Sequence, residues 1–154
     1  MPAAQDGRGL IPADVNSALV TSPRLMARDE LLARGAGVPD SPGLYAWYFR
    51  DLPSLVPLDR CVRHRGYALA YLGIAPSRAS SSSTLRTRLR MHFRGNAGGS
   101  TLRLSLGCLL RDDLALSLLP TRSPRFGSGE RVLSAWMAEH ARVAWVVHPE
   151  PWHL

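Results

Sequence analysis

The sequence contains no lysine, and all 19 of its basic residues are arginines. A Walker-type phosphate loop, a Schiff-base lysine and a lysine general base each need an ammonium group, so these three kinds of site are excluded. A GC-rich genome that favours arginine codons would explain the ratio of arginine to lysine without any function.

Cysteine is scarce, and no segment has the composition of a membrane span or a secretion signal. Cys61 and Cys108 lie far apart with no C-x-x-C pattern, which argues against a disulfide framework and favours a reducing compartment. Cys61 and His64 form a C-x-x-H pair, but a zinc site needs a second pair of ligands at matched spacing, and none is evident. The N-terminus lacks a basic segment followed by an apolar one. We therefore expect a cytoplasmic protein with no membrane partner and no zinc.

The arginines are concentrated in one part of the chain. Residues 60–111 contain ten arginines and no acidic residue, a charge of +10, whereas the rest has nine arginines against 12 acids, a charge of −3. Codon usage does not explain this placement. A concentrated field of one sign is typical of a protein that binds a polyanion, because guanidinium groups pair with phosphate oxygens. The sequence therefore favours a phosphate ligand or a nucleic acid as the partner.

The 154 residues suit one compact domain, and the order of predicted elements is mixed α and β. Residues 1–20 are expected to form a loosely held arm, 51–66 a loop and 76–83 a flexible polar segment. Hydrophobic patterning, with cap and turn residues, predicts helices at 23–34, 85–94, 101–110 and 130–140, strands at 44–50, 67–75, 114–120 and 142–148, and the opening of a further helix at 149–154. We predict an α+β fold, with a small antiparallel sheet of about three core strands flanked by helices.

The helix predicted at 85–94, LRTRLRMHFR, carries two kinds of basic row. Leu85, Leu89 and Phe93 form its apolar stripe. Three arginines run along one side of the stripe and are candidates for gripping a phosphate backbone: Arg86, Arg90 and Arg94. On the other border Arg88 and His92 lie four residues apart, as a pair at the edge of a site would. A solvated basic face with His92 at its boundary explains the same pattern without any site.

Three segments, PGLYAWYF, AYLGIA and LRTRLRMHF, together resemble the GIY-YIG nuclease family. Gly43-Leu44-Tyr45 matches the first motif, Tyr71-Leu72-Gly73 matches the second, and Arg88 with His92 matches the arginine and histidine of the following helix. The likeness runs from about residue 42 to residue 93. The loop between the first two strands is longer than in the shortest family members, and PSRASSSS widens the gap before the helix. We place an N-terminal arm and helix at 1–40 and the GIY-YIG-like domain at 41–154.

The resemblance implies hydrolysis of DNA phosphodiester bonds with Mg²⁺ or Mn²⁺. Tyr45 would help deprotonate the attacking water, and Tyr71 would hold water or phosphate. Arg88 would neutralise charge on the phosphoryl group, and His92 would assist proton transfer or contact phosphate. Because a free tyrosine has a pKa of about 10, Tyr45 would need help from a nearby cation to act as a base. Ordinary strand tyrosines remain the alternative reading of Tyr45 and Tyr71.

The family also needs a glutamate, on a helix after the third strand, to bind the cation. If 114–120 is the third strand, Glu130 opens the next helix and is the candidate ligand. If 142–148 is the third strand, the helix begins at PEPWHL. We prefer the second placement, because similar longer bacterial proteins continue into an acidic helix there, and we expect the domain to lack its metal-binding helix. Glu130 is then an acid at a helix N-terminus, and Glu139 and Glu150 are weaker candidates.

Three hypotheses follow from the sequence. The first is a GIY-YIG-type endonuclease acting on DNA. The second is a nucleic-acid-binding module of the same fold that lacks catalysis, because the metal-binding glutamate is missing. The third is an arginine-rich globular protein with no nucleic-acid partner.

Overall fold

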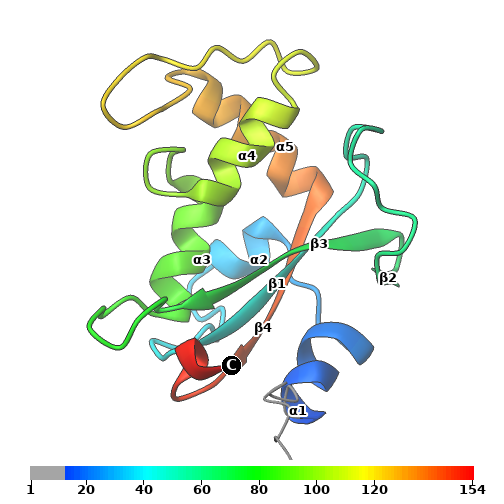
Figure 1. The fold of residues 1–154 in the computed structure, drawn as a ribbon, viewed down its shortest axis with the longest axis vertical. Helices are drawn as coiled ribbons and strands as arrows, with labels where there is room; N and C mark the ends of the chain where they lie inside the picture. Colours follow the sequence, from blue (N-terminus) through cyan, green and yellow to red (C-terminus); the bar gives the residue numbers. More distant parts are fainter. Residues whose placement is uncertain (1–12) are drawn as a thin grey trace, which may run out of the picture.

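The computed structural model describes residues 13–154, which form a four-stranded antiparallel sheet with helices on both faces (Figure 1). Across the sheet the strands are β2 (Arg63–His64), β3 (Tyr67–Ala75), β1 (Gly43–Phe49) and β4 (Ala141–Val147). The three long strands coincide closely with those predicted at 44–50, 67–75 and 142–148. The predicted α+β fold with a small antiparallel sheet is confirmed.

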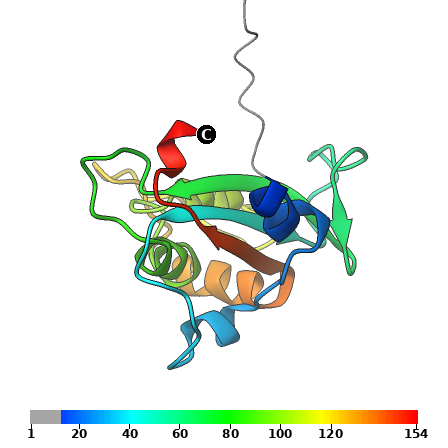
Figure 2. The same ribbon diagram turned by 90° about the horizontal axis from the view of Figure 1, so that it is seen from below.

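The central strand β1 is buried on both faces, as its nearly continuous apolar run requires. Tyr45, Trp47 and Phe49 face the larger hydrophobic core, while the alternating Ala46 and Tyr48 face a smaller one on the other side. Figure 2 shows α3 and α5 beneath the sheet, α2 below them, and α1 on the opposite face. The larger core therefore lies between the sheet and α3 and α5.

The smaller core is covered by residues that were predicted to form a loose arm. Helix α1 (Ala13–Asn16) continues into a single π-helical turn, η1 (Ser17–Thr21), and buries Val15 and Leu19 against the sheet. The hydroxyl of Tyr48 donates a hydrogen bond of 2.6 Å to the carbonyl oxygen of Leu19, which ties η1 to β1. The arm prediction is wrong for residues 13–20, and residues 1–12 lie outside the described part of the chain.

The helix predicted at 23–34 is shorter than the sequence suggested. Only α2 (Arg28–Leu32) is helical, and Ser22 and Pro23 do not open it. Met26 instead exchanges two backbone hydrogen bonds with Val143 of β4, at 2.8 and 3.0 Å, and buries its side chain. Pairing with the sheet edge has overridden local helix propensity here.

Three further helices agree with prediction: α3 (Leu85–Arg94), α4 (Thr101–Leu109) and α5 (Gly129–His140). The side chain of Thr84 accepts a hydrogen bond from the backbone of Thr87 at the start of α3. Ser100 does the same for Arg103 at the start of α4. Both predicted N-caps are therefore confirmed, since each satisfies a backbone N–H that the helix itself leaves unpaired.

Residues 114–120, predicted as a strand, do not join the sheet. They form turns with one isolated bridge, between Leu119 and Arg125. Both edges of β1 are already occupied by β3 and β4, and Ala115 adopts a positive φ of 51°, which no strand residue has. The short strand β2 was missed because it lies inside the segment 51–66 that was predicted to be a loop.

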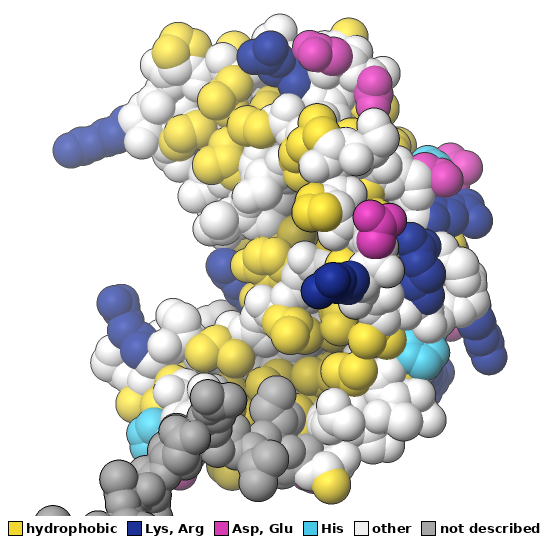
Figure 3. Space-filling model, turned by 45° about the vertical axis from the view of Figure 1, so that its right-hand side comes forward, with side chains coloured by type: hydrophobic (Ala, Val, Ile, Leu, Met, Phe, Trp, Pro, Cys, Tyr) yellow, Lys and Arg dark blue, Asp and Glu magenta, His cyan; other side chains and the backbone are white. Residues whose placement is uncertain are grey.

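One face of the molecule is partly apolar (Figure 3), with arginine and acidic side chains close together along its right-hand edge. Between α1, η1 and the sheet lies a cleft of about 250 Å³ whose lining includes Leu44, Leu72 and Ile74. Leu72 is 58% exposed. Among the described residues, no helix combines the length and the apolar character that a membrane span needs.

Candidate active site

The glycines of the two sequence motifs are needed because other atoms lie where their side chains would be. A Cβ atom on Gly43 would collide with the carbonyl oxygen of Val146 and the side chain of Leu85. A Cβ atom on Gly73 would collide with the ring of Tyr45, its partner across the β1–β3 pair. The ring of Tyr45 therefore lies directly over the backbone of Gly73.

His92 of α3 is fully buried and joins three elements through its ring. Its Nε2 lies 3.1 Å from the hydroxyl of Tyr45 on β1, and its Nδ1 lies 2.7 Å from Oγ of Ser100 at the start of α4. The ring of Tyr71 on β3 lies 6.4 Å from the imidazole, centroid to centroid. The structure thus brings Tyr45, Tyr71 and His92 together, as predicted from the sequence. It also adds Ser100, which the sequence did not predict to be part of this cluster.

Arg88 lies one turn before His92 on the same helix. Its guanidinium donates a hydrogen bond of 3.2 Å to the carbonyl oxygen of Gly99. The positive charge of Arg88 also acts on the hydroxyl of Tyr45 and favours its ionised form. A neutral imidazole has one donor and one acceptor nitrogen. With the Tyr45 hydroxyl donating to Nε2 of His92, the Nδ1–H donates to Ser100. Arg88 and His92 therefore form the predicted pair, with Tyr45 between them.

Burial and positive charge keep His92 neutral. Its pKa is lowered from 6.5 to about 3, first by burial and then by the positive charges of Arg88 and Arg103. The imidazole is consequently a neutral group that can accept a proton but holds it weakly in the free protein.

Tyr45 behaves differently from the activated base that the sequence suggested. Burial raises the pKa of Tyr45 above its ordinary value of 10, and this effect outweighs the hydrogen bond and positive charge of Arg88, which act in the opposite direction. Tyr45 is only 2% exposed. Its hydroxyl therefore stays protonated in the free protein, and Tyr71, which is half-buried, is the more accessible of the two tyrosines.

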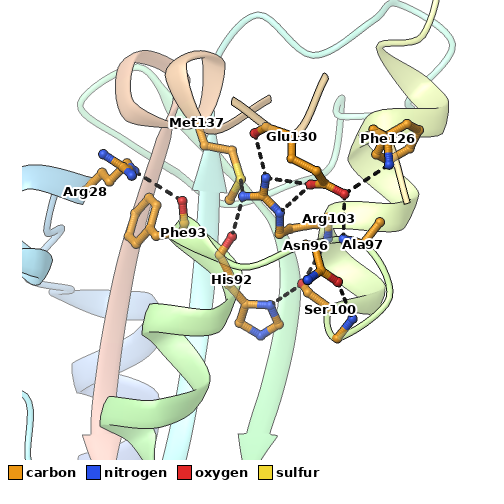
Figure 4. Close-up of polar contacts among 11 residues, drawn as sticks. Arg28, His92, Phe93, Asn96, Ala97, Ser100, Arg103, Phe126, Glu130 and Met137 are labelled. Carbon is orange, nitrogen blue, oxygen red and sulfur yellow. Dashed lines mark hydrogen bonds and ion pairs between the residues drawn. The ribbon is translucent and has the colours of Figure 1, made fainter. Parts of the chain in front are cut away.

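A buried ion pair supports the site from the side of α4 and α5 (Figure 4). The guanidinium of Arg103, with no exposed side-chain surface, lies 2.8 Å from a carboxylate oxygen of Glu130. The same guanidinium donates a hydrogen bond of 3.1 Å to the backbone carbonyl of His92. Burial alone would raise the pKa of Glu130, but hydrogen bonds from the backbone of Ala97, from Arg103 and from the backbone of Phe126 outweigh it and lower the pKa.

Sequence reasoning missed Arg103 entirely. The only signal was an arginine flanked by leucines in TLRLSLG, on a helix whose neighbouring positions face the core. A charged residue among leucines at a buried position needs a partner, and Glu130 is that partner.

Three carboxylates were considered as ligands for Mg²⁺ or Mn²⁺, and the structure places none of them at the Tyr45–His92 cluster. Both carboxylate oxygens of Glu130 already accept hydrogen bonds. Glu139 lies 3.9 Å from Arg50, and Glu150 lies 3.8 Å from His153. Within residues 13–154 no group of three or more His, Cys, Asp or Glu side chains could hold a metal ion. The described residues therefore offer no cluster of side chains that fits the cation.

The order of the elements decides which strand is third. Glu130 opens α5, which precedes β4, and β4 is the third long strand of the sheet. Residues 141–147 are therefore the third long strand, as preferred from the sequence, while the expected lack of a metal-binding helix stays a prediction. After β4 comes a short 3-10 turn, η2 (Pro151–His153), at the place where a helix was predicted to open.

The remaining predicted binding residues lie on the far side of α3 from the cluster. Arg86 and Arg90 line a cleft beside the loop that follows α2, and Arg94 lines a second cleft beside α5. The structure thus brings Arg88 to the Tyr45–His92 cluster, but it directs the row of Arg86, Arg90 and Arg94 elsewhere. Their role as substrate-binding residues stays a prediction.

Comparison with known proteins agrees with this architecture. The family described as GIY-YIG catalytic domain matches residues 43–154, well over half of the chain. The chain belongs to this family, which makes it a nuclease-type domain with nucleic acid as its substrate class. No curated protein and no solved structure matches the chain significantly. The division of the chain at residues 40 and 41 stays a prediction.

Proposed function

We propose that this domain is an endonuclease that hydrolyses DNA phosphodiester bonds at the cluster of Tyr45, Tyr71, Arg88 and His92. The observation that carries the proposal is the series of hydrogen bonds from Tyr45 through His92 to Ser100, next to the positive charge of Arg88. This arrangement combines a fixed cation with a neutral proton acceptor, and phosphoryl transfer to water needs both kinds of group.

In this proposal Arg88 and Tyr71 bind the scissile phosphate. Both side chains are half-buried, so they are accessible to a ligand, whereas Tyr45 and His92 lie behind them. The hydrogen bond from Arg88 to the carbonyl of Gly99 fixes the guanidinium, and its remaining N–H groups can pair with phosphate oxygens. A positioned cation is worth most where water is excluded, and the buried neighbours of Arg88 provide that environment.

Proton transfer in this proposal runs through Tyr45 to His92. The attacking water gives its proton to the oxygen of Tyr45 as the phenol proton moves to Nε2 of His92, while Nδ1–H stays bonded to Ser100. The water oxygen bonds to phosphorus as the bond from phosphorus to the leaving sugar oxygen breaks. That oxygen takes a proton from bulk water, and His92 returns its proton to bulk water after product release. The raised pKa of Tyr45 and the lowered pKa of His92 oppose this transfer in the free protein. A bound phosphate anion offsets the charge of Arg88, which is one of the causes of the lowered pKa of His92. The relay is therefore expected to operate only with substrate in place.

We include dependence on Mg²⁺ or Mn²⁺ in the proposal only because the sequence resembles the GIY-YIG nuclease family. Residues 13–154 contain no group of three or more His, Cys, Asp or Glu side chains that could hold such an ion, so the steps above use protein groups only. The same observation favours a second candidate function, a nucleic-acid-binding module of this fold without strand cleavage. The two candidates share the phosphate contacts of Arg88 and differ only in chemistry.

Nicking of supercoiled plasmid tests the first candidate against the second. Three chains are compared: the wild type, Arg88→Ala and the control Arg122→Ala. The control removes an exposed arginine from the loop after residue 120. Each chain is incubated with the plasmid without added cation, with Mg²⁺ and with Mn²⁺. Nicking by the wild type and the control, but not by Arg88→Ala, supports the endonuclease. Nicking by all three chains would refute the assigned site. Bound but uncut plasmid under every condition would overturn the endonuclease in favour of the binding module.

A further inference from the structure

Six arginines surround the contact between α2 and α3 and form a surface that the proposed active site does not use. We call this surface the α2–α3 arginine face. It comprises two clefts, one at each end of α2, and each cleft is lined by three arginines. The members are Arg28, Arg34, Arg86, Arg90, Arg94 and Arg131.

The first cleft, of about 350 Å³, lies between α2, the end of α3 and the start of α5. Arg28 is held in place by a hydrogen bond of 3.1 Å from its Nε to the carbonyl of Phe93 (Figure 4). Within residues 13–154 no protein group accepts a hydrogen bond from its two terminal nitrogens, which can therefore pair with a ligand. Arg94 and Arg131 are exposed. The one acidic lining residue, Glu130, is already neutralised by Arg103. This cleft is therefore strongly positive.

The second cleft, of about 410 Å³, lies where the loop after α2 meets α3. Arg34, Arg86 and Arg90 line it. Nε of Arg86 donates a hydrogen bond of 2.9 Å to the carbonyl of Val38. This bond fixes the side chain of Arg86 in the same way that the carbonyl of Phe93 fixes Arg28. The single described carboxylate near it is that of Asp40, at 4.0 Å from Arg86, where both side chains are largely exposed and their attraction is weak.

The arginine face points away from Arg88. Successive residues of an α-helix turn by about 100°, so Arg88 and Arg90 point in directions about 200° apart. The row from Arg86 to Arg94 spans eight residues, or about 12 Å, a length over which one strand of B-DNA carries three to four phosphates. A single straight segment of nucleic acid cannot lie on both borders of α3 at once.

We propose that the α2–α3 arginine face binds a second segment of nucleic-acid backbone, separate from the segment bound at Arg88. The proposal rests on the proposed function only for the class of ligand. An acidic protein partner fits less well, because protein interfaces bury apolar groups at their centre, and none of the large hydrophobic side chains that are exposed in the described residues lines either cleft. Guanidinium groups fixed by backbone carbonyls suit phosphate oxygens.

Two variants with equal loss of charge provide the first test. One is Arg28→Gln/Arg94→Gln/Arg131→Gln. The control removes three exposed arginines that line neither cleft, as Arg63→Gln/Arg122→Gln/Arg125→Gln. Binding of a 20-bp duplex is measured by fluorescence anisotropy at several salt concentrations in the presence of EDTA, and gel electrophoresis checks that the duplex stays uncut. Each lost phosphate contact is expected to reduce the slope of log K against log salt by about 0.9.

We expect the face variant to lower this slope by about two to three and the affinity at least tenfold, and the control to lower the slope by less than about one. Equal losses in the two variants would overturn the proposal, because they would report net charge alone. Thermal unfolding checks that each variant is folded. Should the loss of the Arg28 contact unfold the face variant, Arg94→Gln/Arg131→Gln keeps that contact, and an expected slope change of about two still decides the question.

Native mass spectrometry with a six-nucleotide single strand tests whether the two segments are separate. We expect two strands per chain for the wild type and one for the face variant. One strand per chain in the wild type would overturn the proposal. The Arg88→Ala variant distinguishes a failure of the arginine face from a failure of the proposed active site. If Arg88→Ala binds one strand, as the face variant does, both sites exist. If Arg88→Ala binds two strands while the face variant binds one, the arginine face is supported and the proposed active site is refuted.

Discussion

The buried, neutral state of His92 makes a quantitative prediction about acid stability. The pKa of His92 is about 3 in the folded protein, against about 6.5 in an unfolded chain. Below pH 6.5 the unfolded chain therefore binds a proton at this position that the folded protein does not. Stability then rises with pH in this window and falls on acidification, at about 1.4 kcal/mol per pH unit for one such group.

The size of the effect follows from the two pKa values. Near pH 8 both states carry a neutral His92, so the group contributes almost nothing to the pH dependence. Between pH 8 and pH 5 the protonation of His92 in the unfolded chain lowers the free energy of unfolding by about 2 kcal/mol, which is a substantial fraction of the stability of a small domain. The carboxyl of Glu130, whose pKa is lowered from 4.5, acts below this window. The other four histidines are common to the wild type and to a His92→Gln variant, so the difference between these two chains from pH 8 to pH 5 reports on His92.

Urea unfolding of the wild type and of His92→Gln at pH 8 and pH 5 measures the effect. Glutamine can replace the imidazole as a hydrogen-bonding group but does not titrate, so the change in the free energy of unfolding between the two pH values, and not its absolute size, is compared. We expect the wild type to lose about 2 kcal/mol more than the variant. Parallel losses would refute the reasoning and place the pKa of His92 near its ordinary value.

Three further substitutions test single contacts by urea unfolding. Gly73→Ala places a methyl group where the ring of Tyr45 lies, and we expect a loss of about 1–3 kcal/mol, in contrast to Gly35→Ala, which meets no atom but has a positive φ and should show backbone strain alone. Tyr48→Phe removes the buried hydrogen bond to η1 and should cost about 1 kcal/mol and speed hydrogen exchange in residues 13–21. Glu130→Gln leaves the buried charge of its partner uncompensated and should cost about 3–5 kcal/mol, whereas Glu139→Gln at an exposed pair should cost almost nothing.

The sequence predicted elements well where local signals and tertiary packing agree. The three long strands and α3, α4 and α5 carry clear apolar patterns, and Thr84 and Ser100 cap two of the helices as expected. The segment before α2 failed because Met26 pairs with β4, far away in sequence. The strand predicted at 114–120 failed because packing overrides the propensity of this leucine-rich run: Leu116 is buried in the larger core next to the turn at Ala115.

The candidate site was only partly predictable. The spacing on the helix paired Arg88 with His92, the resemblance added Tyr45 and Tyr71 to them, and the structure places the four side chains near one another. The contribution of Ser100 beyond its role as a helix cap was not predictable, because the contact with His92 depends on how α4 lies against α3. The raised pKa of Tyr45 was also out of reach, since it depends on burial, which no local pattern reports.

The buried pair of Arg103 and Glu130 affects both the stability of the domain and the pKa of His92. The Glu130→Gln variant allows these two effects to be measured separately. Arg103 holds His92 through its backbone carbonyl and through Ser100, and its positive charge helps to lower the pKa of His92. Removing the negative charge of Glu130 leaves this positive charge uncompensated and should lower that pKa further, below about 3. The onset of acid destabilisation is set by the unfolded value of about 6.5, so the loss between pH 8 and pH 5 should stay at about 2 kcal/mol while the absolute stability falls. A pH dependence that disappears in Glu130→Gln would instead mean that His92 has left its buried position.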